Sequence, residues 1–132
     1  MKEPVFFDTS AVYALINIKD PDHKKVENFL TGFKGRLLIT NYIFDESITL
    51  IRARLGYEKA ISMGNILLKS PQVEKVWVTP SDEKQAWELF VMRKDKAYSF
   101  TDCTSFVVMK RLKITKCIAL DSHFRQEGFE GI

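Results

Sequence analysis

Four acidic residues stand where the chain is expected to pass between structural elements, and their type suggests a shared chemical role. Asp8 and Asp121 each follow an apolar run, Asp102 lies at the start of a predicted helix, and Glu46 lies within another helix. Carboxylate oxygens are the ligands that hard divalent cations such as Mg²⁺ and Mn²⁺ prefer. The sequence therefore predicts one acidic pocket made of Asp8, Glu46, Asp102 and Asp121.

The negative charge of such a pocket must be neutralised. Two like unit charges about 4 Å apart repel by about 4 kcal/mol at an effective dielectric constant near 20. Protons or cations must therefore compensate the four carboxylates. One or two bound Mg²⁺ or Mn²⁺ ions would do so, and ions of this kind activate water and stabilise the attacking and leaving oxygens in phosphodiester hydrolysis.

Two predicted strands end on an aspartate. The apolar run Val5–Phe7 predicts a buried strand, and Thr9 and Ser10 predict the N-cap of a helix that continues to about residue 18. Residues 116–120 predict another strand, which ends on Asp121. An Asp at the surface that merely closes a strand is the simpler interpretation of the first stretch alone. Carboxyl ends of parallel strands, however, share the edge at which ligands bind.

Two predicted helices direct an acid inward. In the helix over residues 41–55, each residue turns by about 100°, which puts Asp45 on the polar side and Glu46 beside apolar residues. A Glu on such a border is most often a solvated edge residue, which is the alternative here. In the helix that opens at Ser99, helical spacing aligns Asp102 with the inward stripe. The predicted core stripe of the first of these helices consists of Phe44, Ile48, Ile51 and Leu55.

The remaining pattern alternates helices with short apolar strands, which predicts an α/β fold with a parallel sheet. Further strands are expected at residues 36–40 and 73–78, and further helices at about 21–30, 56–69 and 83–93, the last after a helix start at Thr79-Pro80-Ser81-Asp82. A short helix with a possible edge strand is expected in the tail. Trp77 and Trp87 are interpreted as core residues and not as a platform for stacking. Cys103 and Cys117 lack metal-ligand spacing and are expected in the core of a protein from a reducing compartment.

Composition limits the broad class of protein. The chain has 132 residues, 45% of them hydrophobic, which predicts one domain over residues 1–132. No apolar run is long enough for a signal peptide or a membrane span, so a soluble, cytoplasmic protein is expected. The 20 Lys and Arg residues outnumber the 17 Asp and Glu residues. If some acids are interior, the outer surface is basic enough to suit a polyanionic partner.

The order of these motifs resembles that of PIN-domain nucleases and, within them, the VapC-type toxins. The resemblance covers nearly the whole chain, and it rests on four acids in the right order and not on any single motif. Ala119 stands where many relatives have Ser or Thr, which leaves Asp121 the least supported of the four acids, and Cys103 stands where Ala is usual. The matching segments are Phe7-Asp8-Thr9-Ser10, Glu46, Ser99-Phe100-Thr101-Asp102, Leu120-Asp121-Ser122-His123-Phe124 and Gly128-Phe129.

The resemblance implies a three-layer α/β/α sandwich with a central, mainly parallel sheet. It implies a metal-dependent endoribonuclease in which the four acids are both the catalytic and the metal-binding residues. It also implies a homodimer and a cognate antitoxin protein that holds the enzyme inactive. Candidate contacts to RNA phosphates are Arg52, Arg54, Arg93, Lys94 and Lys96, whereas His123 is interpreted as a bystander.

Two other functions are compatible with an α/β chain of this length. A non-catalytic RNA-binding or regulatory module on the same fold would bind RNA without consuming it. A phosphoacceptor domain of the receiver type is also acidic at one sheet edge. The receiver type needs adjacent acids after the first strand and a Lys after the fifth, and the lone Asp8 and the terminal Asp121 argue against it.

Overall fold

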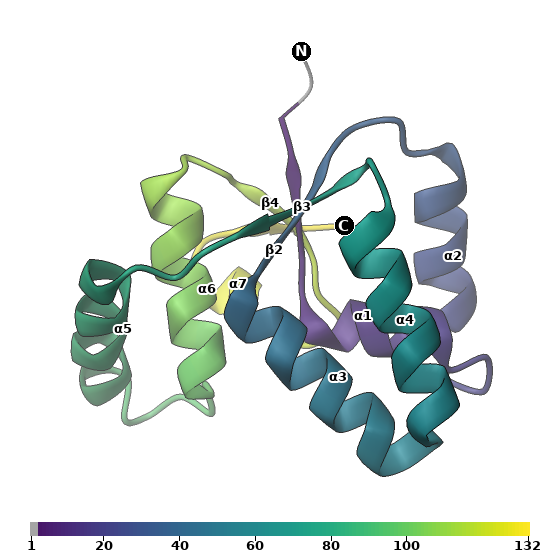
Figure 1. The fold of residues 1–132 in the computed structure, drawn as a ribbon. Helices are drawn as coiled ribbons and strands as arrows, with labels where there is room; N and C mark the ends of the chain where they lie inside the picture. The colour runs from purple at the N-terminus through teal and green to yellow at the C-terminus, as the bar shows by residue number, and fades with distance from the viewer. Residues whose placement is uncertain (1–2) are drawn as a thin grey trace.

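Five strands form one sheet in which every pair is parallel. The structure, a computed structural model, describes residues 3–132, and its strand order is β3-β2-β1-β4-β5. β1 lies in the middle, with β2 on one side and β4 on the other (Figure 1). The strands are β1 (Val5–Phe7), β2 (Leu37–Thr40), β3 (Val73–Val76), β4 (Lys116–Ile118) and β5 (Glu130–Gly131).

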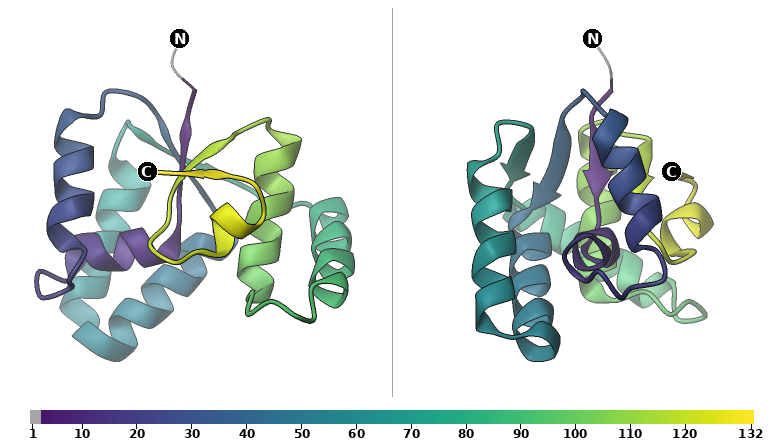
Figure 2. Two further views of the ribbon diagram at one scale, coloured as in Figure 1. Left: turned by 180° about the vertical axis from the view of Figure 1, so that it is seen from behind. Right: turned by 90° about the vertical axis from the view of Figure 1, so that its right-hand side faces the viewer.

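Helices lie on both sides of the sheet, as expected for an α/β/α arrangement. α3 and α4 lie on one side, while α2 and α7 lie on the other (Figure 2). α5 extends outward and packs mainly on α6. No helix in the described range is long and apolar enough to cross a membrane. The helices are α1 (Thr9–Ile16), α2 (His23–Gly32), α3 (Asn41–Leu55), α4 (Tyr57–Lys69), α5 (Pro80–Met92), α6 (Phe100–Arg111) and α7 (His123–Gln126).

The strand order reverses at β1, and this reversal positions the site. The chain adds β2 and β3 on one side of β1, and then crosses over to add β4 and β5 on the other. The crevice at the carboxyl ends of two strands that diverge in this way is the usual ligand site of an open parallel sheet. Here these strands are β1 and β4, which are paired through Phe7 and Ile118. Asp8 and Asp121 follow these two strands.

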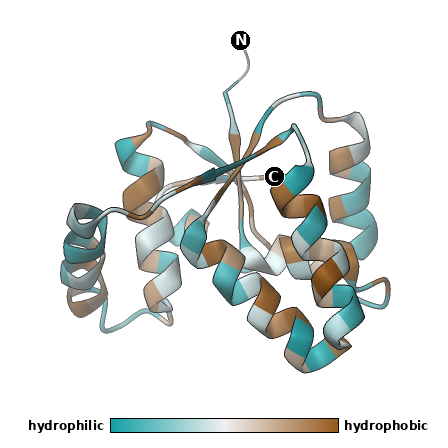
Figure 3. Cartoon of the chain, in the orientation of Figure 1, coloured by the Kyte–Doolittle hydropathy of each residue, from teal (hydrophilic) through white to brown (hydrophobic). Residues whose placement is uncertain are grey.

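The core lies where the sheet meets the inner helices. Figure 3 shows brown hydrophobic segments in the central strands and an alternation of brown and teal along the helices. Cys103 and Cys117 are fully buried, as predicted. The buried face of α3, however, is formed by Ile43, Ser47 and Ile51. Phe44, Ile48 and Leu55 are only partly buried. The sequence therefore placed the core stripe too far toward the side of α3 that packs on α4.

The prediction for both tryptophans was wrong. Trp77 is 63% exposed and Trp87 is 58% exposed. Trp77 follows β3, which ends two residues earlier than expected. Trp87 lies on α5, whose main packing partner is α6, so only one narrow face of the helix is covered. The buried residues of that face are Asp82 and Ala86, and not the aromatic residues.

Candidate active site

Asp8 is buried at the end of β1 and also caps the next helix. Its side chain is 3% exposed and accepts hydrogen bonds from the backbone N–H of Ser10 at 3.1 Å and from the Ser10 hydroxyl at 2.7 Å. The expected cap at Thr9 or Ser10 was therefore wrong: Asp8 has the extended backbone of an N-cap, and α1 begins at Thr9. A short carboxylate accepts the free N–H groups of a first helical turn as well as a hydroxyl does.

Burial raises the pKa of Asp8 to about 7. The largest cause is loss of hydration, and the charges of Asp102 and Asp121 raise the pKa further, while the two hydrogen bonds from Ser10 lower it. Asp102 and Asp121 therefore lie close enough to influence Asp8 electrostatically. The simple interpretation of Asp8 as a surface residue that closes a strand is wrong.

Asp102 is fixed by two kinds of contact. It forms a capping box with Ser99: its backbone N–H donates to the Ser99 hydroxyl at 2.9 Å, and its carboxylate accepts the Ser99 N–H at 3.0 Å. The same carboxylate oxygen lies 2.9 Å from Nδ1 of His123. The side chain of Asp102 is buried, as predicted from its place on the inward stripe of α6. It lies next to the imidazole ring of His123.

His123 is part of the site, so its interpretation as a bystander was wrong. Its backbone N–H donates to Asp121 at 3.0 Å, and its ring packs edge-on against Tyr98. Nδ1 faces both acids, at 2.9 Å from Asp102 and 3.6 Å from Asp121. The sequence shows that His123 is near Asp121, but Asp102 lies 21 residues away and only the fold brings the two together.

Asp121 lies beyond the end of β4 and is more open to solvent than Asp8. β4 ends at Ile118, not at residue 120, and Asp121 follows in a bend with a side chain that is 38% exposed. Ser10 connects this bend to β1, because its hydroxyl accepts the backbone N–H of Leu120 at 3.0 Å while it donates to Asp8. One hydroxyl from α1 thus orders both strand ends.

Glu46 approaches the same place from α3. It is half-buried, unlike its exposed neighbour Asp45. Burial raises its pKa, the charges of Asp102 and Asp121 raise it further, and hydrogen bonds with Thr9 and Thr101 lower it. All four predicted acids therefore belong to one electrostatically coupled group at the carboxyl edge of the sheet.

The group fits a hard cation in charge and in ligand type. The charges of Asp102 and Asp121 raise the pKa of both Asp8 and Glu46, so a cation at this place would relieve repulsion among the carboxylates. All four acids offer oxygen ligands. Within residues 3–132, no group of three or more acids, histidines or cysteines is arranged so that it could hold a metal ion as the side chains stand.

Of the basic candidates, Arg54 lies beside the cluster, whereas Arg52 and Arg93 contact other parts of the protein. Arg54 lies over the ring of Tyr13 and, with Asp121, lines a hollow of about 360 Å³. Arg52 lies over Tyr57, whereas Arg93 is paired with the side chain of Glu127 at 2.8 Å. Lys94 and Lys96 are exposed.

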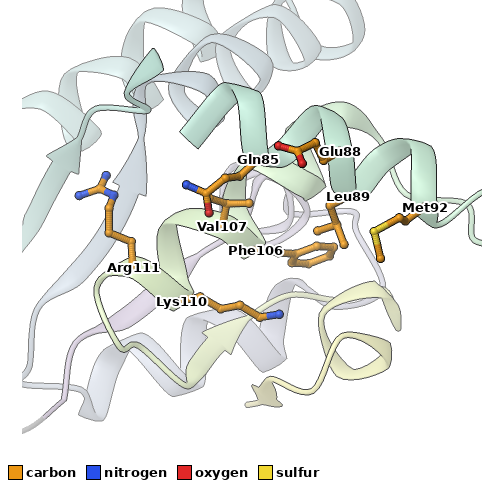
Figure 4. A pocket seen from close by; sticks show the side chains of 8 residues that line it. All are labelled: Gln85, Glu88, Leu89, Met92, Phe106, Val107, Lys110 and Arg111. Atoms are coloured by element: carbon orange, nitrogen blue, oxygen red, sulfur yellow. The ribbon is translucent and has the colours of Figure 1, made fainter. Parts of the chain in front are cut away.

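A separate groove of about 500 Å³ lies between α5 and α6 (Figure 4). It is lined by residues such as Leu89, Met92 and Val107, and none of the four acids is among its lining residues. The four acids at the carboxyl edge of β1 and β4 are therefore separate from this groove.

Comparison with known proteins agrees with the geometry. The sequence profile of the PIN domain matches residues 5–130. A 23S rRNA-specific endonuclease, VapC20 of Mycobacterium tuberculosis, is 34% identical over 125 residues, which cover 95% of each chain. A VapC ribonuclease of Archaeoglobus fulgidus is 32% identical over 123 residues, which cover 89% of this chain and 76% of the relative.

Solved structures give the same result for the fold. The crystal structure of the M. tuberculosis VapC20, described as a toxin that cleaves the sarcin-ricin loop, superposes with a TM-score of 0.90 at 34% identity and covers 95% of both chains. VapBC2 of Rickettsia felis, bound to a promoter DNA fragment, has a TM-score of 0.71 at 13% identity and covers 98% of this chain and 97% of its own. With the profile match, these similarities show that the chain belongs to the PIN-domain family, among its VapC-type members.

Proposed function

We propose that this protein is an endoribonuclease that hydrolyses RNA phosphodiester bonds. The observation that carries the proposal is the buried carboxylate of Asp8 at the strand-order reversal, coupled to Asp102 and Asp121. The burial of a carboxylate costs free energy, and acids whose pKa is shifted in this way cluster at functional sites. The ribonuclease names of the two VapC relatives support the same activity. Because one of them is specific for 23S rRNA, ribosomal RNA is the first substrate to test.

The proposed cofactor is one or two Mg²⁺ or Mn²⁺ ions held by Asp8, Glu46, Asp102 and Asp121. When bound, such ions supply an activated water and charge stabilisation for phosphodiester hydrolysis. The contribution of Ser10 is orientation, since its hydroxyl holds the carboxylate of Asp8. Nδ1 of His123 lies 2.9 Å from the carboxylate of Asp102 and orients that carboxylate. Burial of Asp8 limits the access of bulk water to one side of the cluster.

The proposed biological setting is a toxin–antitoxin pair in the cytoplasm. Membership of the VapC-type group supports an antitoxin protein as partner and a homodimer as the assembled form. The hollow beside Asp121, with Arg54 and Leu50 in its wall, offers a surface of mixed polarity next to the acids for either RNA or a protein segment. The alternative function, a non-catalytic RNA-binding or regulatory module, would bind RNA equally well with and without EDTA and leave it intact.

Substitution of the central acids tests the proposal. Asp8→Asn and Asp102→Asn should each lower the rate of RNA cleavage by at least about 100-fold, because each removes a charge that a catalytic ion needs. The fold should persist, since Asn is also a good N-cap at position 8, and at position 102 its side-chain oxygen can still accept the N–H of Ser99. The measurement is metal-dependent cleavage of ribosomal RNA, with circular dichroism as the check on folding.

Asp45→Asn is the matched control, because Asp45 precedes Glu46 on α3 but is exposed. It should cleave RNA at the rate of the unchanged protein. If both variants of the central acids keep full activity, the nuclease proposal is wrong. If the unchanged protein binds RNA indifferently to EDTA and never shortens it, the binding-module alternative replaces it.

A further inference from the structure

Four aromatic side chains from three helices contact one another in a continuous patch, in which Trp87 and Phe90 are exposed and the other two rings are half-buried. Phe100 lies at its centre, with ring centroids at 6.3 Å from Tyr42, 6.5 Å from Trp87 and 6.3 Å from Phe90. Trp87 and Phe90 stack on each other at 5.8 Å with an interplanar angle of 23°. We call Tyr42, Trp87, Phe90 and Phe100 the aromatic patch. Rings that contact one another in this way present a broad apolar surface that is held in place.

The part of the aromatic patch that lies on α5 is exposed, whereas Tyr42 and Phe100 are half-buried. Trp87 is 58% exposed and Phe90 is 37% exposed. Both lie on the side of α5 that faces away from the groove of Figure 4, whose walls are formed by Leu89 and Met92 on the other side of the helix. The hydroxyl of Tyr42 donates to the carboxylate of Glu83, which fixes the ring at one end of the patch.

The patch borders the acidic cluster through two of its own elements. Tyr42 lies one helical turn before Glu46 on α3, and Phe100 lies two residues before Asp102 on α6. Thr101, between Phe100 and Asp102, hydrogen-bonds Glu46. The aromatic surface therefore begins where the acidic site ends, and it continues outward over α5.

We propose that the aromatic patch is a stacking platform for unpaired bases of the RNA substrate, next to the phosphodiester at the acidic cluster. This inference rests on the proposed ribonuclease function and specifies its substrate as RNA with a looped or single-stranded segment. Unpaired bases stack on exposed aromatic rings, whereas bases within a duplex cannot. Trp87 supplies the largest exposed ring.

The charge near the platform is mixed, and its cations suit nucleic acid. Lys84 lies three residues before Trp87 on the same side of α5, and Lys94 follows the end of that helix, both exposed. Glu83, which accepts the hydroxyl of Tyr42, is an exposed carboxylate beside the rings. Phosphates of a strand whose bases stack on the rings would meet these ammonium groups. A platform with rings beside cations and next to the cleavage site binds a nucleotide strand better than it binds a neutral apolar protein face.

The test measures binding apart from cleavage. Trp77→Phe leaves Trp87 as the single tryptophan, and in EDTA a short single-stranded oligoadenylate should quench its fluorescence on binding. An abasic oligonucleotide of the same length should not, because it has the phosphates without the bases. Trp87→Ala should raise the dissociation constant for the oligoadenylate about tenfold, and Trp87→Tyr should restore most of the affinity.

Val91→Ala is the matched control, since Val91 is also 58% exposed on α5 but has no ring. It should leave the dissociation constant unchanged. Equal affinity of Trp87→Ala and the unchanged protein overturns the platform, as does equal quenching by the abasic strand. A shift from dimer to monomer in Trp87→Ala, with RNA affinity intact, would assign the patch to a contact between copies instead. None of these results depends on whether Asp8→Asn abolishes cleavage, so the two proposals fail separately.

Discussion

At the scale of single residues, Asp8 makes the stability of the ion-free protein depend on pH. Its pKa is about 7 in the folded protein against an ordinary value of 3.8. Between these values the folded state holds more protons than the unfolded state, so the free energy of unfolding falls as the pH rises from about 4 to about 7. The difference in pKa corresponds to roughly 4 kcal/mol.

Asp8→Asn should remove most of this decline and should be more stable than the unchanged protein at pH 7. Urea denaturation in EDTA across this range measures the effect. The raised pKa of Glu46 acts in the same direction, so a smaller decline should persist in the variant. Parallel stability curves for the two proteins would show that Asp8 ionises normally.

The residues that carry charge could be predicted from the sequence, but the residues that orient them could not. Asp8, Glu46, Asp102 and Asp121 each end a strand or interrupt an apolar face, which is a local signal. Ser10 and His123 have no such signal, because their roles depend on partners more than 20 residues away: Ser10 contacts Leu120, and His123 contacts Asp102.

At the scale of elements, α5 is attached to α6 by a buried carboxylate. Asp82, the third residue of the helix, closes a capping box with Thr79 and accepts two hydrogen bonds from Arg111, at 3.0 and 2.8 Å. Burial alone would raise the pKa of Asp82, but Arg111 and Thr79 outweigh it and hold the pKa below its ordinary value. Removal of Arg111 therefore leaves a buried charge without its cation.

Arg111→Met should lower the free energy of unfolding by about 2 to 3 kcal/mol, measured by urea denaturation at neutral pH. The neighbouring Lys110→Met is the control: Lys110 is exposed on the same helix, and the change should cost under about 0.5 kcal/mol. Similar losses in both variants would mean that the ion pair contributes nothing beyond an ordinary surface contact.

The same helix shows where prediction of elements from sequence stops. The Thr79-Pro80 start of α5 was evident, because cap residues act locally. Which of its faces is covered was not evident, because that depends on the single helix against which α5 packs. For this reason Trp87 was predicted in the core and is exposed. The α3 stripe was displaced for a related reason, since α4 covers part of the face with Phe44 and Ile48.

At the scale of the whole molecule, the sheet brings like charges together from four separate parts of the chain. The alternation of strands and helices predicted a parallel sheet, and in a parallel sheet the carboxyl ends of all strands lie at one edge. The strand order itself, with β1 between β2 and β4, is not encoded in any one segment. It arises from packing of the complete chain, and it decides that Asp8 and Asp121 follow neighbouring strands.

An ion that neutralises this cluster should therefore stabilise the whole fold. A ligand that binds only the folded state at 100 times its dissociation constant adds about 2.7 kcal/mol, and hence several degrees to the melting temperature. Mg²⁺ or Mn²⁺ should raise the melting temperature of the unchanged protein and of Asp45→Asn equally, with NaCl at matched ionic strength as the reference. Asp8→Asn should lose most of this rise, because its buried site no longer needs a cation. An equal rise in Asp8→Asn would place the bound ion away from the acidic cluster.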